Sequence, residues 1–480
     1  MMQTLNLVDG VWIPAQTGET FDVLDPATDE VVARVPNGGR ADAVAAIEAA
    51  ARAQPRWRST TADHRAAILW RLAASMRTQT DRLARLMTRE QGKPLAEARG
   101  EIAYAASFFE WAAEEGKRLH GEVIPAPTSD KRIMVLRQPV GVTAAITPWN
   151  FPAAMITRKL GPALAAGCTM VVKPAEQTPL SALALAELAV DAGVPPGVLN
   201  VVTGDPEAIG AAFLEHPAVR VLSFTGSTEV GQHLVARSAQ TLTRLSLELG
   251  GHAPFIVFDD ADLDAAVAGA IASKFRNAGQ TCISPNRFLV HHAVHDEFCA
   301  RMLEACAMLR SGPGCEEGVT TGPLIDDAAV AKVKAHVDDA VARGAVLRCG
   351  GEAVRPAAGL TPRFFAPTLL EGVDGSMRLS HEETFGPVVG VREFSDEAEA
   401  VAIANDTPYG LAAYFYTRDH ARVWRVAEAL EYGIVGVNDG APSTARAPFG
   451  GMKHSGMGRE GGRWVMDEYT EIKYVSWGLG

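Results

Sequence analysis

Apolar residues recur every three or four positions along the first third of the chain, which is the pattern of amphipathic helices. This pattern predicts three helices, over residues 41–54, 62–91 and 96–119. It changes at residues 131–139, where apolar residues between basic ones predict an extended strand that ends at Pro139.

From there to about residue 250, short apolar runs alternate with helical patterns. Repeated βα units of this kind imply a parallel sheet covered by helices on both faces. The predicted strands cover residues 142–146, 170–172, 198–202 and 221–224, and the helices between them include 181–192 and 207–214.

A second α/β segment follows over residues 253–436, with helices predicted at 264–277 and 328–343. The chain then becomes rich in glycine and ends in residues 471–477, whose alternating pattern predicts an edge strand. An exposed edge strand often pairs with another subunit, so this tail indicates self-association.

Net charge, apolar runs and cysteine content indicate which partners, metal sites and cellular compartment to expect. The net charge is −12 and the basic residues form no dense block, so we expect no nucleic-acid partner. No apolar run approaches the roughly 18 residues of a membrane span, and the first residues lack a signal-peptide pattern. The six cysteines form no CxxC pair and no cluster at zinc-ligand spacing. We therefore expect reduced thiols in the cytoplasm and no metal site.

One glycine motif, Gly456-Met-Gly-Arg-Glu-Gly461, has the spacing of the dinucleotide fingerprint. That fingerprint requires a buried strand before it, a helix after it and an acidic residue about 20 positions later. No such strand precedes this segment and too few residues follow it, so we interpret it as a loop.

Two other segments are better candidates for cofactor contacts. Gly226 and Ser227 open a helix directly after a predicted strand, where free N–H groups and the helix dipole favour a pyrophosphate. Lys173 and Glu176 also follow a predicted strand, at the end of a parallel sheet where ligands bind. Considered singly, the first is a common βα turn and the second a surface ion pair.

Seven motifs, in order along the chain, resemble those of the aldehyde dehydrogenase superfamily. The resemblance covers essentially the whole chain, and the motifs around Glu248 and Cys282 are the most specific. The motifs are Trp149-Asn150-Phe-Pro, Lys173-Pro-Ala-Glu176, Phe224-Thr-Gly-Ser227, Leu247-Glu248-Leu-Gly-Gly251, Gly279-Gln-Thr-Cys282, Glu383-Thr-Phe385-Gly-Pro387 and Pro448-Phe-Gly-Gly451.

The resemblance implies an α/β fold in three parts. A Rossmann-like cofactor domain is expected over 1–120 and 140–250, and a second α/β catalytic domain over 251–447. A small β oligomerisation element, over 121–139 and 465–480, would join the subunits of a homodimer or homotetramer.

Three residues of these motifs fit the chemistry of aldehyde oxidation. The thiolate of Cys282 can attack the carbonyl carbon and form a thiohemiacetal, from which hydride can leave. The side-chain amide of Asn150 and the backbone N–H of Cys282 can stabilise the alkoxide. Glu248 can activate the water that hydrolyses the resulting thioester. Without the motifs, the same residues fit a buried structural thiol, a turn asparagine and an ion-paired carboxylate.

The resemblance also assigns cofactor contacts. It implies that Lys173 and Glu176 hold the adenosine ribose, and it places Lys173 in the catalytic set as well. The Glu176 carboxylate suits a free 2′-hydroxyl and would repel the 2′-phosphate of NADP, so we expect NAD, with NADP as the alternative. The other expected contacts are Ser227 and Gly226 for the pyrophosphate, Glu383 and Phe385 for the nicotinamide side, and Trp149 and Leu249 beside them.

Two arginines indicate a substrate that carries its own carboxylate. Arg158 and Arg276, if they point into one pocket, would bind a carboxylate in bidentate fashion. The segments around both residues resemble those of succinate-semialdehyde dehydrogenases. That resemblance adds Ser443 as a third carboxylate contact, with Phe151 and Phe449 as the other substrate-binding residues. We therefore predict irreversible NAD(P)-dependent oxidation of a small anionic aldehyde, succinate semialdehyde, to the acid.

The loop over 440–447 departs from that pattern, because Pro442 and an additional Arg446 change its shape and charge. Glutarate semialdehyde, another acid semialdehyde or a general small aldehyde are therefore alternative substrates. Two other classes fit less well: a reductase that passes the acyl group to coenzyme A does not need Glu248, and a catalytically silent relative does not need the full catalytic set. The segment Cys282-Ile-Ser284 lacks the second cysteine of some relatives, so we predict no redox-switch disulfide there.

Overall fold

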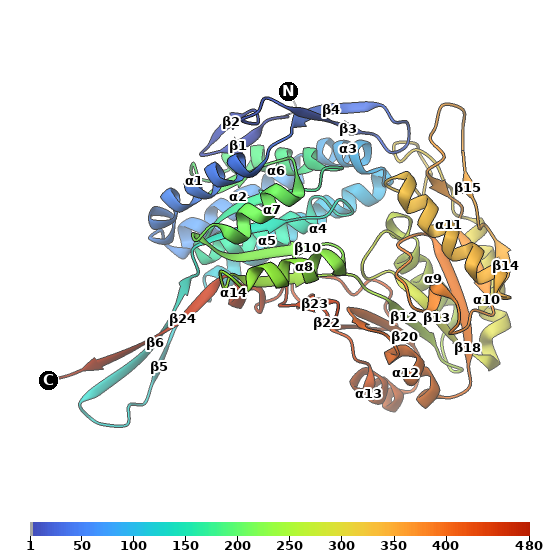
Figure 1. Ribbon diagram of the computed structural model, residues 1–480. Helices are drawn as coiled ribbons and strands as arrows, with labels where there is room; N and C mark the ends of the chain where they lie inside the picture. Colours follow the sequence, from blue (N-terminus) through green and yellow to red (C-terminus); the bar gives the residue numbers. More distant parts are fainter. Residues whose placement is uncertain (1–2) are drawn as a thin grey trace.

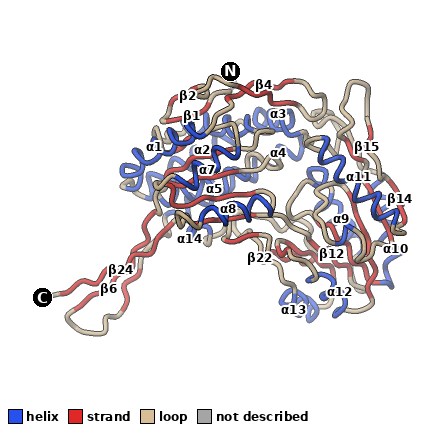
Figure 2. The backbone as a smooth tube through the Cα atoms, viewed as in Figure 1, coloured by secondary structure: helices blue, strands red, loops and turns tan. Residues whose placement is uncertain are grey.

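The computed structural model describes residues 3–480, which form two α/β bodies and a projecting β arm (Figure 1). Each body is built on its own, mainly parallel sheet, and Figure 2 shows the helices packed around the strands. The α/β fold predicted from the alternating pattern is confirmed. Within residues 3–480, no helix is long and apolar enough to cross a membrane.

The first body contains an eight-stranded sheet in the order β2-β1-β9-β8-β7-β10-β11-β23. Its central strands are parallel: β9 (Leu199–Val201), β8 (Thr169–Lys173), β7 (Val142–Ile146), β10 (Val219–Thr225) and β11 (Arg244–Glu248). Antiparallel strands close both edges: β1 (Asn6–Val8) with β2 (Val11–Ile13), and β23 (Gly456–Met457). Alternate residues of β8 enter different hydrophobic clusters, Met170 and Val172 on one face and Val171 on the other, so this strand is buried on both faces.

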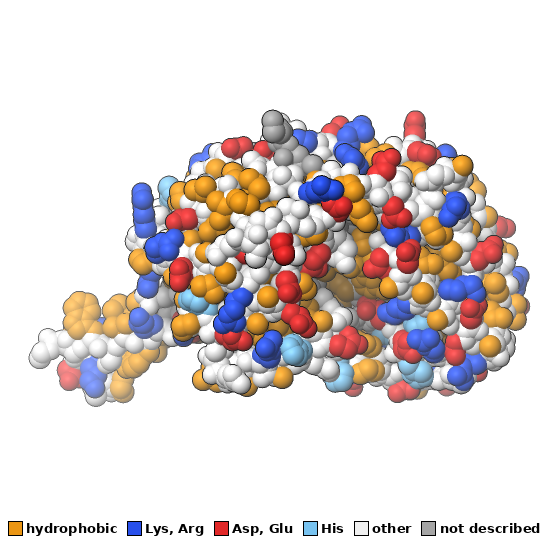
Figure 3. Space-filling model, turned by 45° about the horizontal axis from the view of Figure 1, so that its top comes forward, with side chains coloured by type: hydrophobic (Ala, Val, Ile, Leu, Met, Phe, Trp, Pro, Cys, Tyr) orange, Lys and Arg blue, Asp and Glu red, His pale blue; other side chains and the backbone are white. Residues whose placement is uncertain are grey.

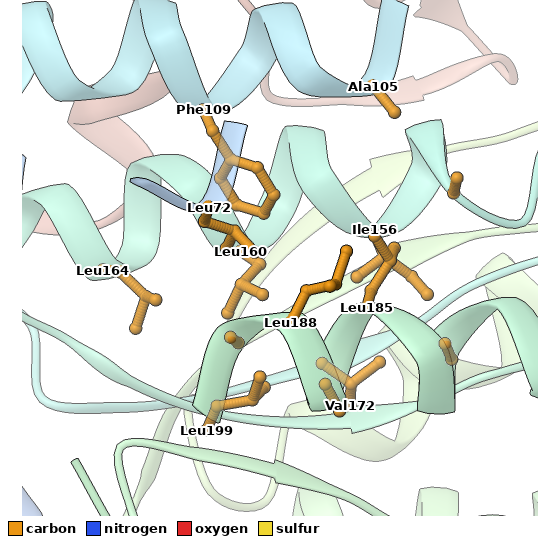
Figure 4. Packing of buried hydrophobic residues seen from close by; sticks show 14 of the residues in the cluster. Leu72, Ala105, Phe109, Ile156, Leu160, Leu164, Val172, Leu185, Leu188 and Leu199 are labelled. Atoms are coloured by element: carbon orange, nitrogen blue, oxygen red, sulfur yellow. The ribbon is translucent and has the colours of Figure 1, made fainter. Parts of the chain in front are cut away.

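Helices cover both faces of this sheet. On one face lie α2 (Ala62–Thr78), α3 (Thr80–Gln91), α4 (Leu95–Gly116), α5 (Ala154–Ala166) and α6 (Pro179–Asp191), and on the other α1 (Arg40–Arg58), α7 (Pro206–Glu215) and α8 (Thr228–Ser238). Figure 4 shows the first layer, where Leu160 of α5 lies between Phe109 of α4 and Leu188 of α6. Every residue of α5 is buried, so the polar side chains of this helix lie inside the protein.

The second body contains a seven-stranded sheet in the order β14-β17-β18-β13-β12-β20-β21. Six strands are parallel: β17 (Thr368–Glu371), β18 (Val388–Phe394), β13 (Pro285–His291), β12 (Ala253–Val257), β20 (Ala412–Tyr416) and β21 (Ile434–Val437); β14 (Val346–Cys349) is an antiparallel edge. Helices α9 (Leu263–Lys274) and α10 (His295–Ala307) cover one face, and α12 (Glu397–Asn405) and α13 (His420–Ala429) the other. Helix α11 (Asp327–Ala342) packs on a further cluster with β17 and β18.

Several short elements complete the chain. They are the hairpin β3 (Thr20–Leu24) and β4 (Val31–Pro36), the pairs β15 (Ala353–Val354) with β16 (Phe364–Phe365) and β19 (Tyr409–Gly410) with β22 (Met452–Lys453), the 3₁₀ turns Arg276–Gly279, His292–Val294 and Arg378–Ser380, and α14 (Val465–Glu468).

The arm is a three-stranded antiparallel sheet of β5 (Glu122–Ile124), β6 (Lys131–Pro139) and β24 (Thr470–Gly478). All nine residues of β24 pair with β6, so the strand predicted at the carboxyl end lies in a sheet formed within the chain. Figure 3 shows hydrophobic side chains gathered along the arm, and Val123, Ile472, Tyr474 and Trp477 are each more than half exposed.

Three sequence-based boundaries were wrong, each for a local reason. The helix predicted over 62–91 is interrupted at Gln79, where the Thr78 and Thr80 hydroxyls donate to backbone carbonyls of the preceding turn. The helix predicted over 264–277 ends at Lys274, because Asn277 takes a left-handed conformation (φ 52°). The loop predicted at 456–461 contains strand β23, which pairs with β11.

Candidate active site

Four of the predicted residues lie at the carboxyl ends of neighbouring parallel strands. Asn150 follows β7, Lys173 ends β8, Ser227 follows β10 and Glu248 ends β11. These strands are adjacent in the sheet, with Lys173 paired to Ile146 and Glu248 to Thr225. The carboxyl edge of an open parallel sheet is where such folds bind ligands, so the topology brings these motifs to one edge.

A cavity of about 560 Å³ opens at this edge and is lined by Lys173, Glu176, Gly226 and Trp149. The Lys173 ammonium forms an ion pair with the half-exposed Glu176 carboxylate. Burial lowers the pKa of Lys173 to about 7, and the negative charge of Asp205 opposes this lowering. Ser227 caps α8 by accepting a hydrogen bond from the Val230 N–H (3.4 Å).

A second cavity, of about 270 Å³, shares Trp149 and Gly226 with the first and reaches Cys282. Its other lining residues include Asn150, Ser227, Leu249, Glu383 and Phe385. Phe385 has a positive φ of 57° and packs edge-on against Trp149, with ring centroids 5.7 Å apart. The Glu383 carboxylate accepts a hydrogen bond from the Gly251 N–H (3.1 Å), and burial raises its pKa to about 7.

The loop before Cys282 is held by an asparagine elbow. Asn277 and Ala278 both have positive φ, so the chain reverses just after α9 and Arg276 does not continue that helix. The amide of Asn277 donates to the carbonyls of Asn150 (3.0 Å) and Gln280 (3.2 Å), and its backbone N–H donates to Glu97 (2.8 Å). The Asn150 loop and the Cys282 loop are thereby joined.

A close backbone contact brings the segment that follows Glu248 next to Cys282. A Cβ atom on Gly251 would lie 2.2 Å from the carbonyl oxygen of Cys282, so only glycine permits this approach. Asn150 uses one amide hydrogen to donate to Gln280 (3.1 Å), and a side-chain amide has a second hydrogen to donate.

The thiol of Cys282 has a raised pKa. Burial raises it to about 12, the Glu383 and Glu248 carboxylates add to the rise, and Arg158 and Arg276 oppose it. At neutral pH without ligands the thiol is therefore protonated, and a base or a bound cationic group is needed to generate the thiolate.

The Glu248 carboxylate is almost entirely buried, and neither of its oxygens has a hydrogen-bond partner among the described residues. Burial raises its pKa well above the ordinary value, and the nearby Glu460 carboxylate raises it further, while Arg158 and Lys159 oppose the rise. A Cβ atom on Gly450 would lie 2.8 Å from Glu248 Oε1, so this glycine leaves room beside the carboxylate.

Of the predicted substrate residues, Arg158 lies on α5, Arg276 in the turn after α9, and Ser443 in an irregular loop. Arg158 is buried, with its guanidinium carbon 4.1 Å from the centre of the Phe449 ring and its Nε 3.0 Å from Glu460 Oε2. Arg276 lies 4.8 Å from the centre of the Phe151 ring.

A family model described as the aldehyde dehydrogenase family matches residues 12–475. The chain belongs to this family. The succinate-semialdehyde dehydrogenase GabD, named for NADP(+), of Escherichia coli strain K12 is 58% identical over 473 residues, which cover 98% of this chain and 97% of that relative. A glutarate-semialdehyde dehydrogenase of Pseudomonas aeruginosa is also 58% identical, over 98% of this chain and 97% of its own length.

A solved structure gives the same result for the fold. The crystal structure of succinate-semialdehyde dehydrogenase from Burkholderia pseudomallei matches with a TM-score of 0.97 at 57% identity, covering 99% of this chain and 98% of that one. The resemblance to aldehyde dehydrogenases stated from the seven motifs is therefore confirmed.

In this aldehyde dehydrogenase, one side of helix α4 carries residues that contact the site and that were not predicted from the sequence. Glu97, Glu101, Tyr104 and Phe108 are spaced by four, three and four residues, which places them on one side of the helix. Glu97 binds the asparagine elbow, Tyr104 accepts a hydrogen bond from Arg158 (3.3 Å), and the Phe108 ring lies under the same guanidinium. Polar residues repeating at helical spacing in an alanine-rich helix were the available signal.

A second missed feature is a buried ion pair beneath Asn150. Lys93 and Glu101 are each about 1% exposed, and the Lys93 ammonium donates to Glu101 (2.6 Å) and to the carbonyl of Asn150 (2.7 Å). Glu101 in turn accepts hydrogen bonds from the N–H groups of Ala153 and Ala154, where α5 begins. The pair thus fixes the Asn150 loop relative to the helix that carries Arg158.

Proposed function

We propose that this aldehyde dehydrogenase oxidises a short aldehyde with a terminal carboxylate, succinate semialdehyde, to the dicarboxylic acid. The observation that supports the substrate class is the pair Arg158 and Arg276, whose charges both act on the Cys282 thiol. Each guanidinium is stacked on a phenylalanine ring, which orients it while leaving N–H groups in its plane to donate. Such a pair binds a carboxylate well and offers little to an apolar chain.

The residues present fit a nicotinamide dinucleotide. The 560 Å³ cavity combines the start of α8, which favours phosphate, with Lys173 and Glu176, which can bind ribose hydroxyls. The adjoining 270 Å³ cavity leads from Glu383 and Phe385 to Cys282. The nicotinamide ring, when bound, supplies the acceptor for the hydride. Both NAD and NADP are candidates, and the Glu176 carboxylate favours NAD.

The residues of the chain account for the remaining chemistry. The Cys282 thiol loses its proton to solvent, and Sγ bonds to the aldehyde carbon. The second amide hydrogen of Asn150 stabilises the resulting alkoxide. After hydride leaves that carbon, a thioester joins it to Cys282.

Hydrolysis of the thioester releases the acid and regenerates Cys282. Glu248 takes a proton from water, the hydroxide adds to the thioester carbon, and the carbon–sulfur bond breaks to give the acid and the free thiolate. A carboxylate beside Cys282 favours hydrolysis over transfer to coenzyme A, because coenzyme A brings its own nucleophile.

Two relatives, one named for succinate semialdehyde and one for glutarate semialdehyde, are each 58% identical to this chain, and their substrates differ in length. Pro442 and Arg446 lie in the irregular loop that carries Ser443, and Arg446 is exposed. Glutarate semialdehyde is therefore the second candidate, and the assay must include both.

The test is a panel of straight-chain aldehydes with and without a terminal carboxylate, followed by NADH or NADPH absorbance. Arg276→Ala is the cleaner variant, because Arg158 also neutralises Glu460. We expect kcat/KM for succinate semialdehyde to fall by about 10- to 100-fold, the loss of a charge-assisted hydrogen bond, with little change for butanal. The exposed Arg34→Ala is the matched control. Equal losses for both aldehydes would refute the substrate class and leave the reaction class intact.

The projecting arm and the cysteines support proposals about the oligomeric state and the cellular compartment. We infer a homodimer or homotetramer from the projecting arm, whose apolar side chains are exposed in a single subunit. The six cysteines are all free, which supports a reducing compartment such as the cytoplasm.

A further inference from the structure

The hydroxyl of Tyr104 takes no part in the chemistry above, yet it contacts two of the residues expected to bind the substrate carboxylate. Tyr104 lies on α4, half-buried, with its ring packed edge-on against Phe108 at 4.9 Å between centroids. Its oxygen lies 3.3 Å from a terminal nitrogen of Arg158 and 2.6 Å from the hydroxyl oxygen of Ser443.

The direction of the hydrogen bond between Arg158 and Tyr104 follows from the groups involved. A guanidinium only donates, so the Tyr104 oxygen accepts from Arg158. Between the Tyr104 and Ser443 hydroxyls either oxygen can be the donor, and the hydrogen of Tyr104 is available for Ser443. When Tyr104 donates, Ser443 keeps its own hydrogen, which can be donated to a third group.

Ser443 needs such an anchor because it lies in an irregular loop. Residues 440–444 form no helix or strand, and the hydrogen bond to Tyr104 joins this loop to a helix that is 339 residues earlier in the chain. The contact therefore sets where the Ser443 hydroxyl lies relative to Arg158.

We propose that Tyr104 determines specificity for acid semialdehydes by orienting the Ser443 hydroxyl, together with Arg158, toward the terminal carboxylate of the substrate. This inference rests on the proposed function. Tyr104 is a positioning residue, since it acts through Ser443 and Arg158 and donates no hydrogen bond to the substrate. An aldehyde without the carboxylate has no acceptor at this place and gains nothing from the arrangement.

The experiment compares Tyr104→Phe, Ser443→Ala and the double variant on succinate semialdehyde and on butanal. Phenylalanine keeps the ring contact with Phe108, so only the hydroxyl is lost. We expect kcat/KM for succinate semialdehyde to fall about tenfold in Tyr104→Phe, through KM and with kcat nearly unchanged, as for the loss of one hydrogen bond. Activity on butanal should change by less than about twofold.

The double variant tests whether Tyr104 acts through Ser443. If Tyr104 acts partly through Ser443, the loss of kcat/KM on succinate semialdehyde in the double variant is smaller than the product of the losses in the two single variants. The exposed Ser59→Ala is a control for removal of a hydroxyl, and thermal unfolding checks that each variant is folded.

The other possible outcomes contradict either the role of Tyr104 or the proposed substrate. Equal losses on both aldehydes in Tyr104→Phe, or losses that multiply in the double variant, overturn the role of Tyr104 while the proposed substrate class stands. A wild-type enzyme that does not prefer the acid semialdehyde overturns the proposed substrate, and this inference with it.

Discussion

The guanidinium of Arg158 and the carboxylate of Glu460 lie 3.0 Å apart inside the protein, and each side chain is no more than 2% exposed. Glu460 also pairs with Lys159, the next residue of α5. The same carboxylate therefore fixes a candidate substrate ligand and, by repulsion, raises the pKa of Glu248. A change at Glu460 should affect substrate binding and hydrolysis together.

Substitution of Glu248 should separate acylation from hydrolysis. Glu248→Gln removes the base, so a first turnover of NAD(P)H should appear as a burst, followed by a steady rate at least about 100-fold below wild type. Because the pKa of Glu248 is raised, the wild-type steady rate should rise with pH as this carboxyl ionises, and the variant should lose that rise. Stopped-flow absorbance measures both phases. An unchanged steady rate would contradict the role of Glu248.

Alkylation should report the raised pKa of Cys282. Without ligands, inactivation by iodoacetamide should still be accelerating above pH 9, because burial and the Glu383 charge raise this thiol pKa to about 12. Glu383, with a pKa near 7, is ionised over that range, so Glu383→Gln should move the profile to lower pH. The exposed neighbour Glu382→Gln is the control. A wild-type profile that levels off below pH 8 is the opposing result.

The buried pair Lys93–Glu101 should be important for stability. Lys93→Met leaves the Glu101 carboxylate buried without its cation, which costs about 3–5 kcal/mol of unfolding free energy. Lys117→Met breaks the exposed pair with Glu114 and should cost less than about 1 kcal/mol. Chemical denaturation of both variants measures the difference. Equal costs would show that the buried pair is not coupled to folding.

Cofactor choice should depend on Glu176. Its carboxylate pairs with Lys173 and is 37% exposed, so it faces the cavity expected to receive the adenosine ribose. Glu176→Gln removes repulsion of a 2′-phosphate and should raise the ratio of kcat/KM for NADP over NAD by about tenfold. Glu187→Gln, a partly exposed carboxylate on α6, is the control. A wild-type enzyme with a clear preference for NADP would refute the expectation of NAD.

The arm should mediate assembly. Ile472→Asp introduces a charge on an exposed apolar strand and should lower the molar mass found by light scattering after gel filtration. Val11→Asp changes a similarly exposed residue, 58% against 67% for Ile472, on edge strand β2 outside the arm, and should leave the mass unchanged. A monomeric wild type, or loss of mass in both variants, would argue against the arm as the interface.

The sequence predicted the strand ends and their motifs well, because Asn150, Lys173, Ser227 and Glu248 follow short apolar runs that have a local signature. The partners of these residues were not predictable in the same way. Tyr104 reaches Ser443 across 339 residues, and Glu460 reaches Arg158 across 302, so only the packing of α4 and α5 brings them together.

The contact between Glu460 and Arg158 could not be predicted from the sequence. Glu460 lies in the segment 456–461, which has the glycine spacing of the dinucleotide fingerprint and was interpreted as a loop, and no local pattern marks its acidic residue as a partner of Arg158. Within this segment, a Cβ atom on Gly456 would lie 2.0 Å from the carbonyl of Leu247, so that glycine serves close packing against β11. Glycine spacing in a sequence does not distinguish a ligand contact from such a backbone contact.

The asparagine elbow has a consequence for how the enzyme moves. Asn277 belongs to the second body, but its backbone N–H is bound by Glu97 and its side-chain oxygen by Gln91 of the first (2.9 Å). These hydrogen bonds, one buried and one partly buried, join the two bodies and oppose a hinge motion between their sheets. We therefore expect the two bodies to keep the same arrangement when the cofactor binds, and small-angle scattering should give the same curve with and without cofactor.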